Sequence, residues 1–171
     1  MSVNSIQQSV VSVIKFLTEH PEECRYVDKA ATAVIEDGLR CRAEGPNGMM
    51  VTSDMSKAIG GGGSAPSPGW LLRAALANCY ATVIAIRSAQ LGVTLSALEV
   101  TVDSESDDRG LLGMDDTIHA GPLSMRIRVR IGANSTTPEH LKEIVEWSGA
   151  HSPVADAVRR AIPCEREVEI V

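Results

Sequence analysis

The stretch from Pro68 to Leu91, PGWLLRAALANCYATVIAIRSAQL, places the strongest constraint on the fold of this chain. Ser67 can cap a helix there, and Pro68 occupies the first helical position, where a missing N–H costs nothing. Gly92 supplies a typical stop at the far end. Apolar side chains cover nearly the whole circumference of this helix instead of one stripe. We therefore expect a helix that is buried on all sides, either at the centre of the domain or in a subunit interface.

The segments around this helix show helical and strand-like patterns in turn. Apolar residues at helical spacing predict a helix over residues 6–17, which Pro21 ends. Three short β-type runs, AATAVI, LRCRAE and MMVTS, follow between turn-forming clusters. After the long helix, ALEVTVDSES and LSMRIRVRI predict two strands, TPEHLKEIVEW and PVADAVRRA two helices, and REVEIV a closing strand. This order predicts an α+β fold with antiparallel sheets.

Charge and composition argue against several classes of function. The net charge of −6, with no cluster of lysine and arginine on one predicted face, disfavours nucleic acid and anionic membranes as partners. The uncharged apolar run 74–86 is shorter than the roughly 20 residues that a bilayer requires. The N-terminus lacks the pattern of a signal peptide. We therefore expect a cytoplasmic protein that does not contact a membrane.

The four cysteines are widely spaced and form no CxxC pair, so the sequence supports neither a zinc site nor a disulfide framework. We expect free thiols and no metal or cofactor. The run IGGGGSAPSP lacks the spacing of known phosphate-binding loops, which favours a flexible approach loop. The two aspartate pairs in DDRGLLGMDDTIHAG could bind a divalent cation, but a solvated loop is the favoured interpretation.

Cys79 lies about three turns inside the long apolar helix, beyond the reach of the partial charge at the helix start. Apolar surroundings disfavour a thiolate, so a reactive Cys79 needs a cation from elsewhere in the fold. Arg40 and Arg42, on a predicted strand, are better candidates than Arg73 and Arg87, which are not helical neighbours of Cys79. A buried cysteine that packs as a small hydrophobe is the alternative.

The stretch GGGGSAPSPGWLLRAALANCYATVIAIRSAQLGV, followed by LEVTVD and later by AHSPVADAV, resembles the OsmC/Ohr family. That family comprises osmotically induced and organic-hydroperoxide-resistance proteins. The resemblance spans roughly residues 30–171, so residues 1–28 are interpreted as an N-terminal helical extension and residues 29–171 as a single OsmC-like domain. It implies an intertwined homodimer in which two long central helices are wrapped by antiparallel sheets, with active sites at the subunit interface.

The resemblance also implies a chemistry. In active members the helix cysteine attacks a peroxide and becomes a sulfenic acid, which a second cysteine in a Cys-Pro-Val context converts to a disulfide. Cys79 matches the first cysteine, whereas Ser152, in HSPV, stands in place of the second and cannot form a disulfide. Gly69 and Trp70 stand where the family carries a glutamate, and an arginine expected shortly before them has no match in SDMSKAIGGGG.

Two hypotheses follow. In the first, the chain is a one-cysteine thiol peroxidase that reduces organic hydroperoxides, with an external thiol as reductant. Arg40 or Arg42 would stabilise the thiolate of Cys79, and Ser152 or His151 would hydrogen-bond the leaving oxygen. In the alternative, the dimer is not catalytic and binds an apolar small molecule in an interface pocket beside Trp70. An accessory role in thiol metabolism is a third interpretation that no residue singles out.

Overall fold

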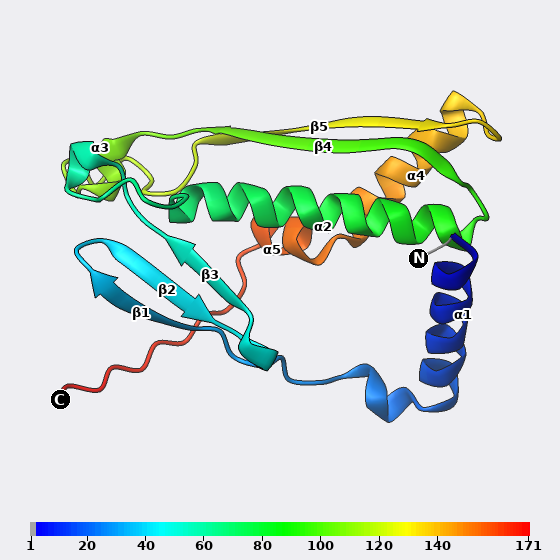
Figure 1. The fold of residues 1–171 in the computed structure, drawn as a ribbon, viewed down its shortest axis with the longest axis horizontal. Helices are drawn as coiled ribbons and strands as arrows, with labels where there is room; N and C mark the ends of the chain where they lie inside the picture. Colours follow the sequence, from blue (N-terminus) through cyan, green and yellow to red (C-terminus); the bar gives the residue numbers. More distant parts are fainter. Residues whose placement is uncertain (1–2) are drawn as a thin grey trace.

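A computed structural model describes residues 3–171 and shows helices and strands in alternation (Figure 1). The order and bounds of the elements are α1 (Val3–Glu19), η1 (Pro21–Cys24), β1 (Thr32–Asp37), β2 (Arg40–Glu44), η2 (Pro46–Gly48), β3 (Met50–Ser53), η3 (Lys57–Ile59), α2 (Pro68–Gln90), β4 (Leu95–Glu105), α3 (Asp108–Leu111), β5 (Ser124–Ala133), α4 (Pro138–His151) and α5 (Pro153–Arg159). The predicted mixed α and β architecture is confirmed.

Both sheets are antiparallel. The first has the strand order β1-β2-β3, and the second is the long pair β4-β5, in which Val100 lies opposite Val129. Along this pair, apolar side chains alternate with charged ones, and Asp103 on β4 forms ion pairs with Arg126 and Arg128 on β5. Alternation of this kind places one face on the core and one in solvent.

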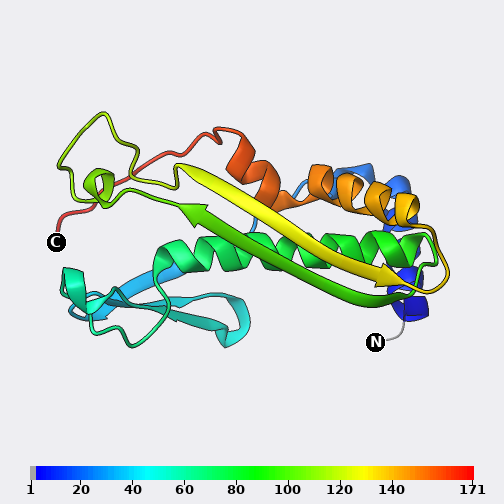
Figure 2. The same cartoon turned by 90° about the horizontal axis from the view of Figure 1, so that it is seen from above.

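Helix α2 runs beneath the β4-β5 pair, with α4 and α5 along one side (Figure 2). Its start is the predicted one, because the Ser67 hydroxyl oxygen accepts a hydrogen bond from the Trp70 N–H at 3.2 Å. A cluster of buried side chains joins α2 to α4 and to the sheet, namely Ile84, Val93, Leu141 and Ile144. Among the described helices, α2 alone is long and apolar enough to cross a membrane, but a helix in a globular core passes the same test.

The expectation that α2 is buried on all sides is not met by one chain. Its buried residues are Leu76, Ile84, Ser88 and Ala89. A row of residues along another face is exposed, namely Leu72, Ala75, Asn78 and Thr82. The chain covers α2 with β4, α4 and α5, and with α1 at its C-terminal end. The exposed row therefore has no cover within the chain.

Two parts of the chain stand off this body. The sheet β1-β2-β3, which we call the arm, stands apart from α2 (Figure 1). Residues 161–171 form no helix or strand, so the prediction of a closing strand at REVEIV is wrong for the single chain. Val168 is 76% and Ile170 93% exposed. A strand needs a neighbour to accept its backbone hydrogen bonds, and none lies beside this segment.

The glycine-rich loop before α2 is organised around the buried carboxylate of Asp54. This carboxylate accepts hydrogen bonds from the N–H groups of Met55 (2.7 Å), Gly62 (3.2 Å) and Ser64 (2.9 Å), and from the Ser64 hydroxyl (2.8 Å). The two bonds from Ser64 contribute most to lowering the pKa of Asp54 to about 2. A Cβ atom at Gly61 would collide with the Met55 carbonyl. These hydrogen bonds and the close approach at Gly61 organise the loop around Asp54.

Candidate functional site

Cys79 lies in the middle of α2, half-buried, and its sulfur contacts the segment that joins α4 to α5. The Ser152 hydroxyl donates a hydrogen bond to Cys79 Sγ over 3.0 Å, across 73 residues of chain. Ser152 itself is 0% exposed. The structure therefore brings together two of the residues that the sequence analysis singled out, on elements far apart in sequence.

Local sequence explains how Ser152 reaches this place. Ser152 ends α4 and caps α5, and Pro153 occupies the first position of α5. The Ser152 oxygen accepts a hydrogen bond from the Ala155 N–H at 3.3 Å. Because the oxygen accepts from the helix, its own proton is free to point at Cys79 Sγ. The hydroxyl can therefore donate to the sulfur while its oxygen caps α5.

The two candidate strand arginines are engaged within the arm. Arg42 forms ion pairs with Glu44 and, over 2.6 Å, with Glu36. Arg40 donates to Glu36 at 3.3 Å and to the Ser64 hydroxyl at 2.7 Å. The hydrogen bond from Arg42 is the main cause of the lowered pKa of Glu36. Neither guanidinium is hydrogen-bonded to Cys79 in this chain.

The arginines of α2 also point elsewhere. Arg73 donates to the Ser104 hydroxyl at 3.1 Å. The Arg87 guanidinium lies over the Trp147 ring, 4.4 Å from its centroid. Both observations agree with the expectation that neither side chain is a helical neighbour of Cys79.

His151 and Trp70 lie away from the sulfur. The His151 ring stacks on Trp147 with centroids 3.8 Å apart, and its Nδ1 is 2.7 Å from the Trp147 carbonyl oxygen. Trp70 is exposed and precedes Cys79 by nine residues on the same helix, a separation of about 13 Å along the axis. The structure does not bring either ring to Cys79 within one chain.

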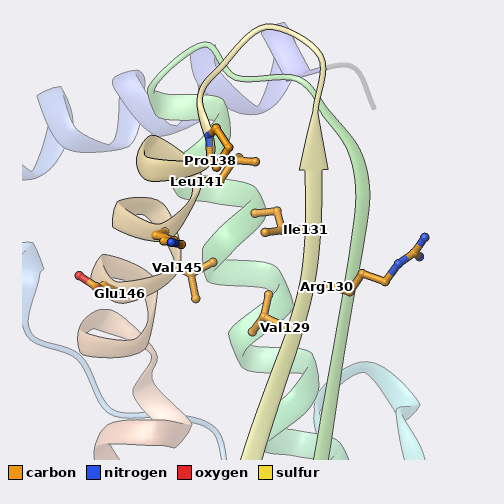
Figure 3. A pocket seen from close by; sticks show the side chains of 8 residues that line it. Val129, Arg130, Ile131, Pro138, Leu141, Val145 and Glu146 are labelled. Carbon is orange, nitrogen blue, oxygen red and sulfur yellow. The ribbon is translucent and has the colours of Figure 1, made fainter.

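A pocket of about 570 Å³ opens between β5 and α4. Figure 3 shows Val129 and Ile131 pointing into it, whereas Arg130 points to the other side of β5. A second pocket of about 320 Å³ lies at the start of α2. Gly69 and Arg73 line it, together with Asp107 of the following loop. Cys79 lines neither pocket.

Across residues 3–171, no group of three or more histidine, cysteine, aspartate or glutamate side chains could hold a metal ion. In the loop with the two aspartate pairs, the ion pair with Arg109 lowers the pKa of Asp107 to about 2. Asp115 accepts hydrogen bonds from Thr117. All four cysteines are free thiols.

Sequence reasoning missed the roles of Asp54 and Glu36. The signal for Asp54 was a carboxylate placed a few residues before a run of glycines, whose N–H groups can all approach one acceptor. The signal for Glu36 was a carboxylate across the turn from two arginines on the next strand. Both carboxylates fix the arm and the loop that precede α2.

A family model described as OsmC-like protein matches residues 61–167. Among solved structures, an OsmC like protein from Mycoplasma pneumoniae is similar, with a TM-score of 0.66, 15% identity, and coverage of 79% of this chain and 89% of that one. An organic hydroperoxide resistance protein OsmC from Legionella pneumophila has a TM-score of 0.58 and 18% identity, with coverage of 79% of this chain and 91% of that one. An organic hydroperoxide resistance protein from Elizabethkingia anophelis, crystallised with thiocyanate bound, has a TM-score of 0.58 and 16% identity. The match covers 80% of this chain and 91% of that one. At these low identities, the TM-scores show that the chains share a fold. No curated protein matches the chain.

Proposed function

Because this chain belongs to the OsmC-like protein family, we propose that it is a one-cysteine thiol peroxidase that reduces organic hydroperoxides as a cytoplasmic homodimer. The observation that carries the proposal is the 3.0 Å hydrogen bond from the Ser152 hydroxyl to the half-buried sulfur of Cys79. The names of two structural neighbours support organic hydroperoxides as the substrate class. The predominantly apolar side chains of α2 are compatible with an organic substrate.

In the proposed reaction, the Cys79 thiolate attacks one oxygen of the hydroperoxide. A sulfur–oxygen bond forms, the O–O bond breaks, and the organic fragment leaves as an alcohol after taking a proton. The sulfur becomes a sulfenic acid, oxidised by two electrons. Ser152 lies where its hydroxyl can hydrogen-bond the transferred oxygen.

Ser152 carries no sulfur, so the sulfenic acid must react with a thiol from outside the chain. An external thiol condenses with it, forming a mixed disulfide and releasing water. A second thiol then attacks the mixed disulfide, which restores Cys79 and releases a disulfide product. The external thiols supply both electrons, and the scheme uses no metal or cofactor.

The surface of the single chain supports a homodimer. The chain exposes 12591 Å². A compact monomer of this size exposes about 8,100 Å² by the usual scaling of area with mass. The excess of roughly 4,500 Å² is several times the ~800 Å² per partner in a standard stable interface. A second copy that packs on the arm, the open face of α2 and the C-terminal segment would remove this excess.

A dimer also offers a source for the missing cation. The arm that carries Arg40 and Arg42 stands off its own body (Figure 1). In the proposed dimer, one of these guanidinium groups lies close to Cys79 of the partner subunit and stabilises its thiolate.

One observation favours the alternative of a non-catalytic dimer that binds an apolar small molecule. Glu36 and Glu44 already neutralise the strand arginines within the arm. If those pairs persist in the dimer, no cation from the arm is left for the sulfur. The interface beside Trp70 would then be a binding surface only.

Sulfenate trapping separates the two functions. The protein is treated with cumene hydroperoxide in the presence of dimedone, and labelling is read by mass spectrometry for the wild type, Cys79→Ser and Cys41→Ser. Cys41 is the matched control because it is the other half-buried cysteine. The peroxidase proposal expects label in the wild type and in Cys41→Ser but not in Cys79→Ser. Absence of label, with peroxide left unconsumed in the presence of several thiols, would instead support the binding function.

A further inference from the structure

Helix α1 carries an apolar stripe that its own chain covers only in part. The stripe consists of Ile6, Val10, Val13, Ile14 and Leu17, which share one face at helical spacing. Its first half packs against the C-terminal end of α2, where the Gln7 side-chain amide donates to the Gln90 carbonyl at 3.3 Å. In its second half, Val13 is 55% and Ile14 52% exposed.

The position of α1 explains this difference. Figure 1 shows α1 leaving the end of α2 and running away from the body of the chain. Residues 25–31, which lead from there to the arm, have no regular structure, and Tyr26 and Val27 within them are strongly exposed. The second half of α1 therefore extends beyond α2, and the short turn η1 lies beside its end, where the Cys24 thiol donates to the Leu17 carbonyl at 3.6 Å.

A helix with one apolar face normally packs that face against other protein atoms. Most helical stability in proteins comes from such packing rather than from intrinsic propensity. The other sides of the helix carry its polar residues, including the Lys15–Glu19 pair, together with two exposed apolar residues, Val11 and Phe16. The sequence of α1 is thus that of a helix covered along its whole length, although one chain covers half of it.

We propose that the second half of this stripe, Val13, Ile14 and Leu17, docks on a second copy of the chain, so that α1 is a clasp across the dimer. This inference rests on the homodimer of the proposed function. The excess exposed area of the single chain, roughly 4,500 Å² by the scaling used above, indicates that a second copy of the chain covers the stripe. That area is several times what a stable dimer needs. Helix α1 also lies outside the matched residues 61–167, so the clasp adds to the interface that the family domain supplies.

A matched pair of identical substitutions tests the clasp. Val13→Glu places a charge in the stripe, and Val11→Glu places the same charge on a valine with similar exposure, 59% against 55%. Residues two positions apart on a helix are separated by about 200° around its axis, so Val11 faces nearly opposite to Val13. We expect Val13→Glu to raise the dimer dissociation constant at least tenfold in sedimentation equilibrium. Val11→Glu should stay within about twofold of the wild type.

Hydrogen exchange of the wild-type protein gives a second measurement that needs no variant. Amides of residues 10–17 should exchange more slowly at concentrations where the dimer forms than after dilution to the monomer. A Val13→Glu protein that dimerises like the wild type, together with equal exchange of residues 10–17 in both states, would overturn the clasp and leave the dimer standing. A wild-type protein that is monomeric at every concentration would overturn both. Peroxide consumption is measured separately and reports on Cys79 alone.

Discussion

Replacing Ser152 with cysteine should create a disulfide that the natural chain lacks. The Ser152 oxygen lies 3.0 Å from Cys79 Sγ, so a sulfur at that position lies close to bonding distance. Oxidation of the Ser152→Cys protein should therefore link residues 79 and 152 within one chain. In the proposed reaction, the same substitution would let residue 152 condense with the Cys79 sulfenic acid and release water.

The size of the effect follows from the length of the closed loop. The two residues are 73 positions apart. In the chain-entropy model a loop of this length stabilises the folded state by about 4 kcal/mol. For a protein of this size each kcal/mol corresponds to roughly 2–4 °C, so oxidation should raise Tm by roughly 8–16 °C. Comparing the oxidised and reduced forms of the same variant cancels the cost of fitting a larger atom into a buried site.

The assay combines thermal unfolding, with and without dithiothreitol, and peptide mapping by mass spectrometry. Ser88→Cys is the control, because Ser88 is equally buried but lies nine residues from Cys79 on the same helix, about 13 Å along the axis. It should show no linkage to Cys79 and no reductant-dependent Tm. If oxidised Ser152→Cys gave no 79–152 linked peptide and the same Tm in both forms, the geometry of the site would be refuted.

Three further substitutions test the parts that position the site. The pKa of Asp54 is lowered from 3.8 to about 2, so its carboxylate stabilises the fold above pH 3.8, and this contribution is lost as pH falls through 2. Asp54→Asn should therefore lower Tm at pH 7. It should also flatten the loss of Tm between pH 4 and pH 2. Gly61→Ala should destabilise the fold by about 1–3 kcal/mol in urea, because the new Cβ meets the Met55 carbonyl. Ile144→Ala, at a fully buried position of α4, should lose about 2–5 kcal/mol in the same assay, and Ile144→Val only about 0.5–1.5 kcal/mol.

Much of the fold could be predicted because its signals are local. The serine and proline at the start of α2 specify its first turn, and alternation along β4 and β5 specifies their two faces. These patterns depend on neighbours a few residues away. Burial around the whole of α2 and a strand at residues 166–171 depend on a surface that this chain does not provide. The single chain therefore leaves one face of α2 exposed and residues 166–171 without a strand partner.

The candidate site divides in the same way. Cys79 could be selected from its place in an apolar helix, and Ser152 from the resemblance to a Cys-Pro-Val context. The partners of Arg40 could not be predicted in this way, because Glu36 and Ser64 come close to Arg40 only through a turn and a folded loop. A single sequence shows which residues are charged, but not which oppositely charged residue each of them pairs with in the folded chain.

The open face of α2 and the separate arm have a thermodynamic consequence. If a chain completes its core only against an identical chain, folding and association become one bimolecular reaction. Unfolding midpoints would then shift with protein concentration, and each tenfold dilution would remove about 1.4 kcal/mol per mole of dimer. The abundance of such a protein in a cell would itself set the fraction that is folded.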